Sequence, residues 1–334
     1  MIIDDIREYL KVRSNPVQLV KHLDEVPENK IQYPLIGQKK YDGLYCLVIV
    51  QGGIFDLYSR TGKAYYHEVA EAISDQFYND MSCMLDDGVY ITELCNDQVS
   101  LEVLSGLVST NRKKDWTTEE EAIVWQSYCM FHDFLTFEEF LDGYSEQPYM
   151  VRYYELTKRL TRAERETLLV LNTPIYDRDG ADKFADAIIE KGGEGAVFKQ
   201  NVDWEAGHKG YRAMKIVRGL HVDLLCIGVQ YGKGKRSGQI AKLEFSYKGS
   251  VFSADLGKGW TDARRSALTN AHEKSVGCTV FTGTYGHGSN AGVTEYPPVG
   301  KIWEVKALQE SSTGKALRLP KVVRVREDKD TPDY

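Results

Sequence analysis

The segment Lys40-Tyr41-Asp42-Gly43 combines a lysine, a carboxylate and a glycine where a loop enters an apolar, strand-like run. A lysine amine becomes a covalent nucleophile when desolvation or a neighbouring positive charge keeps it neutral. Asp42 is spaced to orient such a site or to bind a metal, and Gly43 lets the backbone approach a phosphate. The segment therefore predicts a nucleophile at Lys40, with a solvated turn lysine as the alternative.

Two further polar positions follow in the first third of the chain. Ser59-Arg60-Thr61-Gly62 is a turn whose arginine is suited to a ribose or a phosphate. Glu93 lies within the apolar strand Val89–Leu94, where a carboxylate needs a lysine, a hydroxyl or a metal ion as its partner. A side chain on the outer face of an alternating strand is the alternative for Glu93.

Charged residues also mark the middle and the end of the chain. Glu194 opens a short strand that ends at Lys199, and its carboxylate is suited to a divalent metal. Lys215 projects from another strand, where its charge would lower the pKa of Lys40. Arg326-Glu327-Asp328-Lys329 follows the strand Val322–Val325 and is spaced to hold a pyrophosphate. The tail after this segment is expected to be loose.

In this order, the pieces resemble the motifs of the covalent nucleotidyltransferases, which comprise DNA ligases, RNA ligases and mRNA capping enzymes. The likeness is greatest to the small two-domain ATP-dependent DNA ligases of bacteriophages, and it covers about Gly37 to Lys329. Asp255-Leu-Gly-Lys-Gly-Trp260 also looks like a segment of their barrel. The resemblance implies an α+β fold. A nucleotidyltransferase (adenylation) domain of antiparallel sheets flanked by helices, residues 1–218, precedes a C-terminal OB-fold β-barrel, residues 219–334.

The same resemblance implies an activity. The chain would seal 5′-phosphate/3′-hydroxyl nicks in duplex DNA through a lysyl-AMP intermediate and an adenylated DNA 5′-phosphate. ATP and Mg²⁺ or Mn²⁺ are the implied cofactors, and nicked double-stranded DNA is the implied partner. A monomer in the cytoplasm, with no membrane association, is expected.

The resemblance also implies roles for individual residues. Lys40 would carry the AMP, Asp42 would support the site, Lys215 would contact the α-phosphate, and Arg326 and Lys329 would orient pyrophosphate. Further nucleotide contacts are implied at Gln38, Arg60, Glu93 and Lys199, and metal ligation at Glu93 and Glu194. The aromatic that stacks on adenine is His132 or, after a shift of one residue, Phe131. A phenyl ring is the more usual platform, which favours Phe131.

Two positions depart from the family pattern. The family usually has K-x-D-G-x-R, and Tyr45 replaces the arginine. It usually has K-x-K around the second lysine, and Ala213 replaces the first of that pair. Both changes remove a cation near phosphate. Arg212 is the neighbouring replacement, although adjacent residues of a strand face opposite sides.

Two basic segments are suited to the DNA backbone, which is contacted without reading sequence. The expected contacts are Arg112, Lys113 and Lys114 in one segment and Lys233, Lys235 and Arg236 in a glycine-rich loop of the barrel. Charge is also asymmetric, because residues 217–334 hold 18 of the 42 bases and 12 of the 49 acids. A basic C-terminal part suits a polyanion, and a chance difference between two solvated surfaces is the alternative.

Composition restricts the remaining classes of protein. The 334 residues are 42% hydrophobic and 27% charged, as in a soluble globular protein. The six cysteines form no C-x-x-C pair and the seven histidines form no H-E-x-x-H motif, so no built-in metal cage is expected.

Hydrophobic periodicity and turn residues predict the elements that must position these residues. In the first domain, strands are expected at the end of Gly37–Val50 and at Asp56–Ser59, Val89–Leu94, Tyr128–Leu135, Gly195–Lys199 and Ala213–Val217. Helices are expected at Ala64–Asn79, Tyr149–Leu169 and Ala181–Lys191, with a capping box at Thr136–Glu139 opening another. The barrel strands are expected at Leu224–Val229, Lys242–Tyr247, Val251–Ala254, Cys278–Gly283 and Ile302–Ala307, with a helix at Arg264–Glu273.

Three rival functions stay open. An RNA ligase or a capping-type guanylyltransferase would share the covalent first step. A non-catalytic nick-binding protein on a ligase scaffold is motivated by Tyr45 and Ala213.

Overall fold

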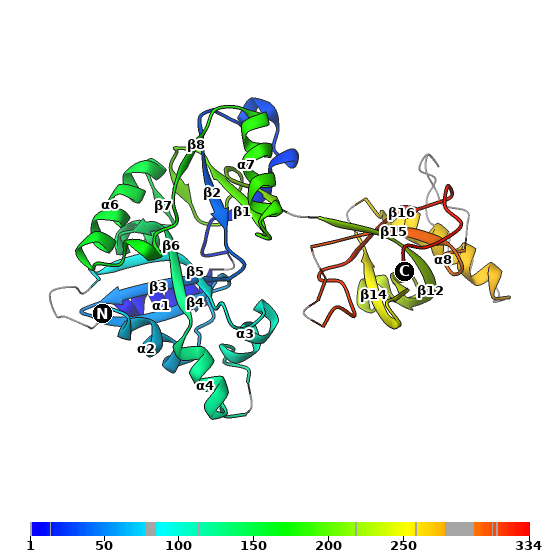
Figure 1. The fold of residues 1–334 in the computed structure, drawn as a ribbon, viewed down its shortest axis with the longest axis horizontal. Coiled ribbons are helices and arrows are strands. Elements are labelled where there is room, and N and C mark those ends of the chain that lie inside the picture. The colour runs from blue at the N-terminus through cyan, green and yellow to red at the C-terminus, as the bar shows by residue number, and fades with distance from the viewer. Residues whose placement is uncertain are drawn as a thin grey trace. The chain divides into compact units, whose positions relative to one another are not determined.

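The structure is a computed structural model that describes residues 2–13, 15–77, 85–112, 114–217, 219–257, 259–277, 297–308, 310–311 and 313–334. The chain divides into two compact units, Met1–Val217 and Arg218–Tyr334, whose elements are labelled in Figure 1. The sequence predicts a boundary one residue later, after residue 218. No helix within these described ranges is long and apolar enough to cross a membrane.

The first unit contains two large sheets and one small one. The first large sheet has the order β1-β11-β9-β2-β8 and is antiparallel apart from the parallel pair β1 and β11. Its strands are β1 (Leu19–His22), β2 (Leu35–Lys40), β8 (Thr173–Ile175), β9 (Gly195–Lys199) and β11 (Lys209–Val217). The second large sheet, β4-β3-β5-β6, is antiparallel throughout. Its strands are β3 (Leu44–Gln51), β4 (Ile54–Ser59), β5 (Gly88–Cys95) and β6 (Tyr128–Leu135); β7 (Tyr144–Ser145) and β10 (Trp204–Glu205) form the small sheet.

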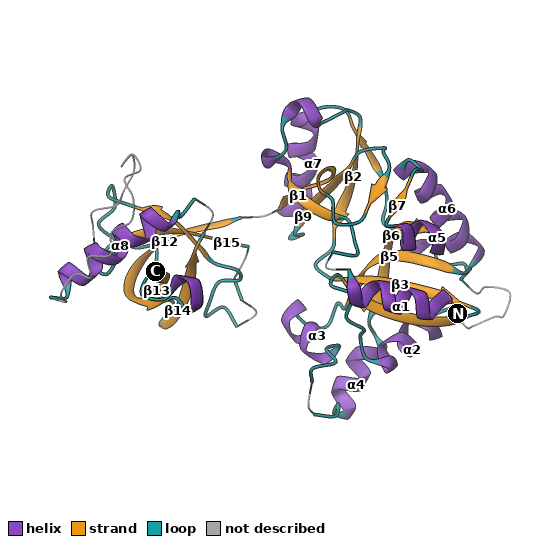
Figure 2. Cartoon of the chain, turned by 180° about the vertical axis from the view of Figure 1, so that it is seen from behind, coloured by secondary structure: helices purple, strands orange, loops and turns teal. Residues whose placement is uncertain are grey.

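Helices flank these sheets, as Figure 2 shows from behind. They are α1 (Ile2–Val12), α2 (His67–Asp75), α3 (Leu101–Leu107), α4 (Thr118–Trp125), α5 (Phe137–Asp142), α6 (Tyr149–Arg162) and α7 (Arg178–Glu190). Short 3-10 turns occur at Leu23–Glu25, Glu28–Lys30 and Glu166–Leu168. Residues of α2, α3, α4 and α6 share one core with the second sheet, α1 and α5 pack on its other face, and α7 packs on the first sheet.

The apolar run of β3 explains why this strand lies inside the unit. Successive side chains of a strand point to opposite faces, and here both faces are covered. Val48 and Val50 join the core with α2 and α6, whereas Leu47 and Ile49 join the core with α1 and α5. A strand buried on both faces reads as a continuous apolar run rather than an alternating one.

Local signals predicted one helix start correctly and one helix end wrongly. The capping box at Thr136 and Glu139 is present and opens α5. The helix expected to reach Leu169 is wrong at its end, because α6 stops at Arg162. Glu164 then adopts a left-handed φ of 52°, which a continuing α-helix excludes.

The second unit is a closed five-stranded barrel of order β12-β13-β14-β16-β15. Its elements are β12 (Leu220–Tyr231), a 3-10 turn (Gly234–Arg236), β13 (Ile240–Tyr247), β14 (Ser250–Leu256), α8 (Asp262–Ser275), β15 (Ile302–Ala307) and β16 (Lys321–Val325). A five-stranded barrel with one helix between its third and fourth strands is an OB-fold. The strand expected at Cys278–Gly283 lies outside the described residues. The α+β fold class with a C-terminal OB barrel is confirmed.

Candidate active site

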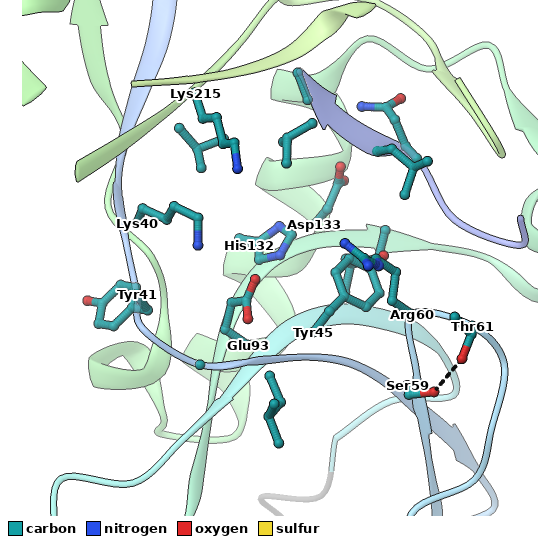
Figure 3. Close-up of a pocket in the computed structure, with 18 of the residues that line it drawn as sticks. Lys40, Tyr41, Tyr45, Ser59, Arg60, Thr61, Glu93, His132, Asp133 and Lys215 are labelled. Carbon is teal, nitrogen blue, oxygen red and sulfur yellow. Dashed lines mark hydrogen bonds between the residues drawn. The ribbon is translucent and has the colours of Figure 1, made fainter. Parts of the chain in front are cut away.

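The first unit holds a cavity of about 790 Å³ lined by strands of both large sheets. Figure 3 shows several of its side chains converging from the two sheets. Residue types that bind phosphate, metal or a nucleobase are concentrated there. Of the predicted residues, the cavity is lined by Gln38, Lys40, Arg60, Glu93, His132, Lys199 and Lys215.

Lys40 ends β2, and its Nζ lies 2.7 Å from Glu194 Oε2. The two meet because Gly195, which follows Glu194, is the register partner of Lys40 on β9. Lys215 on β11 faces the same cavity, where burial and then the charge of Lys40 lower the pKa of Lys215. The structure thus surrounds Lys40 with the predicted carboxylate and the predicted second lysine. Asp42, in contrast, is exposed to solvent.

Glu93 and Tyr45 are cross-strand partners on β5 and β3, and both face the cavity. Burial raises the pKa of Glu93 to about 7, against the opposing charge of Lys40. Burial also raises the pKa of Tyr45 well above its usual value, so the phenol is neutral at physiological pH. This position therefore brings a hydroxyl where the family usually brings a cation. Arg60 lies near Tyr45 in Figure 3 and supplies a positive charge that acts on both Tyr45 and Glu93.

Ala213 stands where the family pattern K-x-K has its first lysine, and the neighbouring cation, Arg212, does not replace that lysine. Ala213 is buried and lines the cavity. The guanidinium of Arg212 lies 2.7 Å from Asp203 and 2.9 Å from Glu205. Adjacent residues of β11 face opposite sides, so Arg212 does not compensate for Ala213.

His132 on β6 is held in one protonation state by Lys199. Lys199 Nζ lies 3.1 Å from His132 Nδ1 and donates to the His132 carbonyl at 3.0 Å. Burial and then the charge of Lys199 lower the pKa of His132 to about 3. A neutral imidazole that accepts at Nδ1 carries its proton on Nε2. Lys199 therefore positions His132, and its ammonium is engaged by the histidine.

The preference for Phe131 as the stacking platform is wrong. Phe131 is fully buried and packs edge-on against Phe77 and Tyr90 in the core beneath the second sheet. His132, the next residue, has no register partner on β5, because β6 pairs Phe131 and Asp133 with the consecutive residues Thr92 and Ile91, and it is His132 that lines the cavity. The alternative that aligned the stacking position with His132 agrees with this geometry.

His132 predicts a specific dependence of stability on pH. In the unfolded chain the imidazole takes a proton near pH 6.5, whereas in the folded protein it resists protonation down to about pH 3. Between these values the unfolded state binds more protons, so acidification lowers the free energy of unfolding, by about 5 kcal/mol over the window. His132→Phe removes this loss, so the variant gains on the wild type as pH falls.

Urea denaturation at a series of pH values measures this gain. His67→Phe is the matched control, because the His67 side chain is 80% exposed. A constant difference between His132→Phe and wild type from about pH 7 to about pH 4 would contradict the expected behaviour.

Sequence reasoning missed three residues behind the cavity. Arg152 Nε and Nη2 each donate to Asp133 at 3.0 Å. Tyr149 and Asn172 both accept hydrogen bonds from the side chain of Gln38. These contacts join residues that are 19 to 134 positions apart. Spacing along the chain therefore does not predict them. The one signal in the sequence was that all three residues are polar: Tyr149 and Arg152 lie on the amphipathic helix α6, and Asn172 lies between α6 and β8.

On the barrel, Arg326 and Lys329 are brought together by Asp223 of β12. Arg326 Nη1 and Lys329 Nζ lie 2.5 and 2.6 Å from the same oxygen of Asp223. Arg326 also pairs with Asp328 at 2.7 Å, and Lys329 pairs with Asp333 at 2.9 Å. The tail expected to be loose is anchored, because Asp223 and Asp333 exchange two hydrogen bonds of 2.8 Å through their backbone amides. The two predicted cations therefore lie together among three carboxylates.

The basic residues predicted to contact DNA differ in their exposure and in whether another group of the protein already binds them. Lys233, Lys235 and Arg236 are exposed in the loop between β12 and β13, and Lys114 is exposed near α4. The guanidinium of Arg112 is engaged by Glu120 at 2.6 Å and by the Lys114 carbonyl at 2.8 Å, which supports the start of α4 rather than a free phosphate contact. Lys113 lies outside the described residues.

A comparison with protein families shows which family has a domain that matches this part of the chain. The model for the ATP dependent DNA ligase domain matches residues 17–216, a range that holds all of the cavity residues discussed above. The chain belongs to the ATP-dependent DNA ligase domain family. The ligase domain match covers more than half of the chain and stops at the boundary between the two units.

Individual ligases agree with this assignment. A probable DNA ligase of Streptomyces coelicolor is 26% identical over 304 residues, covering 89% of this chain and 56% of that protein. DNA ligase B of Mycobacterium tuberculosis is 31% identical over 166 residues, covering 46% of this chain and 31% of that protein. The chain thus spans about half the length, or less, of these curated relatives. A solved structure from work on Lig E DNA ligases has a TM-score of 0.65 at 16% identity and covers 93% of this chain and 98% of that one, a likeness of fold.

Proposed function

We propose that this chain is an ATP-dependent DNA ligase that seals 5′-phosphate/3′-hydroxyl nicks in duplex DNA. The observation that carries the proposal is the placement of Lys40 in the ligase-domain cavity, 2.7 Å from Glu194 and facing Lys215. Phosphoryl transfer depends mainly on positioning and charge stabilisation, and this cavity offers a nucleophile, acids and cations together.

In the first step, Lys40 Nζ attacks the α-phosphorus of ATP. A nitrogen–phosphorus bond forms while the bond from that phosphorus to the pyrophosphate oxygen breaks. Glu194 Oε2, 2.7 Å from Lys40 Nζ, is placed to take the proton that the amine must lose. Lys215 contacts the α-phosphate, and the neutral face of His132 supports the adenine ring.

In the second step, an oxygen of the DNA 5′-phosphate attacks the phosphorus of the bound AMP, and the bond to Lys40 breaks. In the third step, the 3′-hydroxyl attacks the 5′-phosphate and AMP leaves. Arg60 lies beside the cavity, where its guanidinium is suited to the ribose or to the nick phosphate.

A Mg²⁺ or Mn²⁺ ion fits the carboxylates around Lys40. Glu93 and Glu194 would hold it, since Mg²⁺ commonly takes one or two carboxylates together with substrate phosphates. The raised pKa of Glu93, caused mainly by burial, is a condition that a nearby cation would relieve. When bound, the ion supplies neutralisation of the charge that develops on the phosphates.

Arg326 and Lys329 orient the pyrophosphate in this proposal, so the carboxylates beside them compete with phosphate. Asp333→Asn keeps an oxygen for the Asp223 amide but removes the charge that holds Lys329. Exposed ion pairs contribute little, so we expect adenylation at subsaturating ATP to rise by only about two- to fivefold. Asp330→Asn is the control, because it removes the same charge from an exposed position of the same segment. Equal adenylation rates for Asp333→Asn and Asp330→Asn would show that Asp333 does not compete with phosphate for Lys329.

Lys114, Lys233, Lys235 and Arg236 are the exposed cations that we propose for the DNA backbone, as sequence-independent contacts. Binding to nicked duplex should then weaken steeply with salt. A monomer acting in the cytoplasm is the simplest working state for such a ligase.

Incubation with α-labelled ATP or GTP and Mg²⁺, followed by denaturing electrophoresis, tests the proposal. A covalent label from ATP and sealing of a nicked DNA duplex support it. A label from GTP would favour a capping-type transferase, and sealing of RNA alone would favour an RNA ligase. Absence of any label from folded protein free of AMP would favour a nick-binding protein, the alternative suggested by Tyr45 and Ala213.

A further inference from the structure

Gln38 presents a side-chain amide to the cavity in a defined orientation. The residue is 2% exposed and lines the cavity beside Lys40. Its Nε2 donates to the Tyr149 hydroxyl at 2.8 Å and to Asn172 Oδ1 at 2.9 Å. Both amide hydrogens are therefore engaged, and the carbonyl oxygen Oε1 is the end of the amide left to accept a hydrogen bond.

The two partners of Gln38 are themselves held as acceptors. The Tyr149 hydroxyl has one hydrogen and two acceptors for it, the His132 carbonyl at 3.0 Å and Asn172 Oδ1 at 3.3 Å, so it meets Gln38 with a lone pair. Asn172 Nδ2 points at the Met150 sulfur, 3.7 Å away, which leaves Asn172 Oδ1 directed at Gln38. Turning the Gln38 amide over would break this arrangement at a residue that is buried.

We infer that Tyr149 and Asn172 are positioning residues that hold Gln38 as a hydrogen-bond acceptor and thereby select adenine over guanine. The inference rests on the proposed function, in which Gln38 contacts the nucleotide. Adenine carries an amino donor at N6, where guanine carries the O6 acceptor. A fixed Gln38 Oε1 accepts a hydrogen bond from the adenine N6 amino group, whereas it repels the guanine O6 acceptor.

The orientation needs support because the two ends of a glutamine amide are nearly the same size. A free glutamine would turn over at little cost and accept either base. A site whose polar group is fixed rejects the wrong ligand by leaving a buried group unpaired. Selectivity then resides in Tyr149 and Asn172, which need not touch the nucleotide.

The test is the ratio of initial labelling rates with α-labelled ATP and GTP for Tyr149→Phe and Asn172→Leu. We expect each change to lower the ATP-to-GTP ratio by about tenfold, the equivalent of roughly one hydrogen bond. Tyr153→Phe is the matched control: it lies one turn further along α6, removes a hydroxyl that donates to the Val170 carbonyl at 2.9 Å, and should keep the wild-type ratio.

Gln38→Glu supplies a second test that a purely structural role would not pass. A carboxylate accepts from N6 in either orientation, so its selectivity no longer needs the two partners. In the Gln38→Glu background, Asn172→Leu should therefore leave the ratio unchanged, although the same substitution lowers it in the wild-type background. Thermal unfolding of each variant verifies that it is folded. If Asn172→Leu does not fold, Tyr149→Phe replaces it in this test.

The outcomes separate the inference from the proposed function. Wild-type protein that takes a label from neither nucleotide overturns the proposed function and this inference with it. Wild-type protein labelled by ATP, with variants that slow ATP and GTP equally, overturns the inference alone. A loss of selectivity that Gln38→Glu suppresses confirms the positioning role.

Discussion

Lys40→Ala abolishes the covalent label from α-labelled ATP, with an expected fall in the adenylation rate of about 10⁴-fold or more. In the proposed first step the nitrogen of Lys40 forms the bond to the α-phosphorus, and alanine offers no atom in its place. Lys40→Arg keeps the positive charge beside Glu194 but should be equally inactive, because a guanidinium stays protonated. Gel electrophoresis of the labelled protein measures both variants.

Lys39→Ala is the matched control for this experiment. Lys39 is the neighbouring lysine of β2, it is exposed, and its Nζ lies 4.8 Å from the ring centre of Tyr41. Its loss should leave most of the labelling intact. Lys40→Ala should also still join a nick that already carries AMP, because the proposed final step does not use the lysine. Undiminished labelling of Lys40→Ala would refute the assignment of the nucleophile.

Arg152→Met is the substitution with the largest expected cost in stability, about 3–5 kcal/mol in the free energy of unfolding. The side chains of Arg152 and Asp133 are each only 4% exposed. Although burial opposes ionisation, Arg152 and then Lys199 hold the pKa of Asp133 below its usual value. Removing Arg152 would leave a buried carboxylate whose remaining cation, Lys199, is 3.8 Å away.

Urea denaturation of three variants tests this role. Arg162→Met is the control from the same helix: the Arg162 side chain is 58% exposed and pairs with Asp86 at 2.8 Å, so its loss should cost at most about 1 kcal/mol. Adding Asp133→Asn to Arg152→Met removes the unpaired charge and should recover part of the stability. A cost for Arg152→Met no greater than that of Arg162→Met would contradict the role.

Tyr45 and Ala213 both line the cavity, and they replace two cations of the family pattern. Arg212 does not restore the charge, because Asp203 and Glu205 hold it on the other face of β11. Seven lysine and arginine residues line the cavity, and Arg60, Lys40 and Lys215 are the three of them that we propose for the phosphates. In the proposed reaction, substrate phosphates would then rely on these residues.

The sequence by itself determined the class of fold and predicted Lys40 as the central nucleophile. Short apolar runs separated by glycine turns predicted the barrel, and the capping box predicted the start of α5. The ordered motifs around Lys40, Glu93, Glu194 and Lys215 predicted a shared site, and the structure places these residues together. Such signals are local in the chain, so they survive without knowledge of what packs against them.

Only the tertiary structure decided which neighbouring side chain faces the cavity and which charges are already paired. Phe131 and His132 are adjacent, and the strand pairing of β6 alone assigns the phenyl ring to the core and the imidazole to the cavity. Likewise, the pairing of Arg326 and Lys329 with Asp223 joins residues about a hundred positions apart. The network from Gln38 to Tyr149 and Asn172 arises in the same way, since hydrogen-bond partners are chosen by packing in space and not by spacing along the chain.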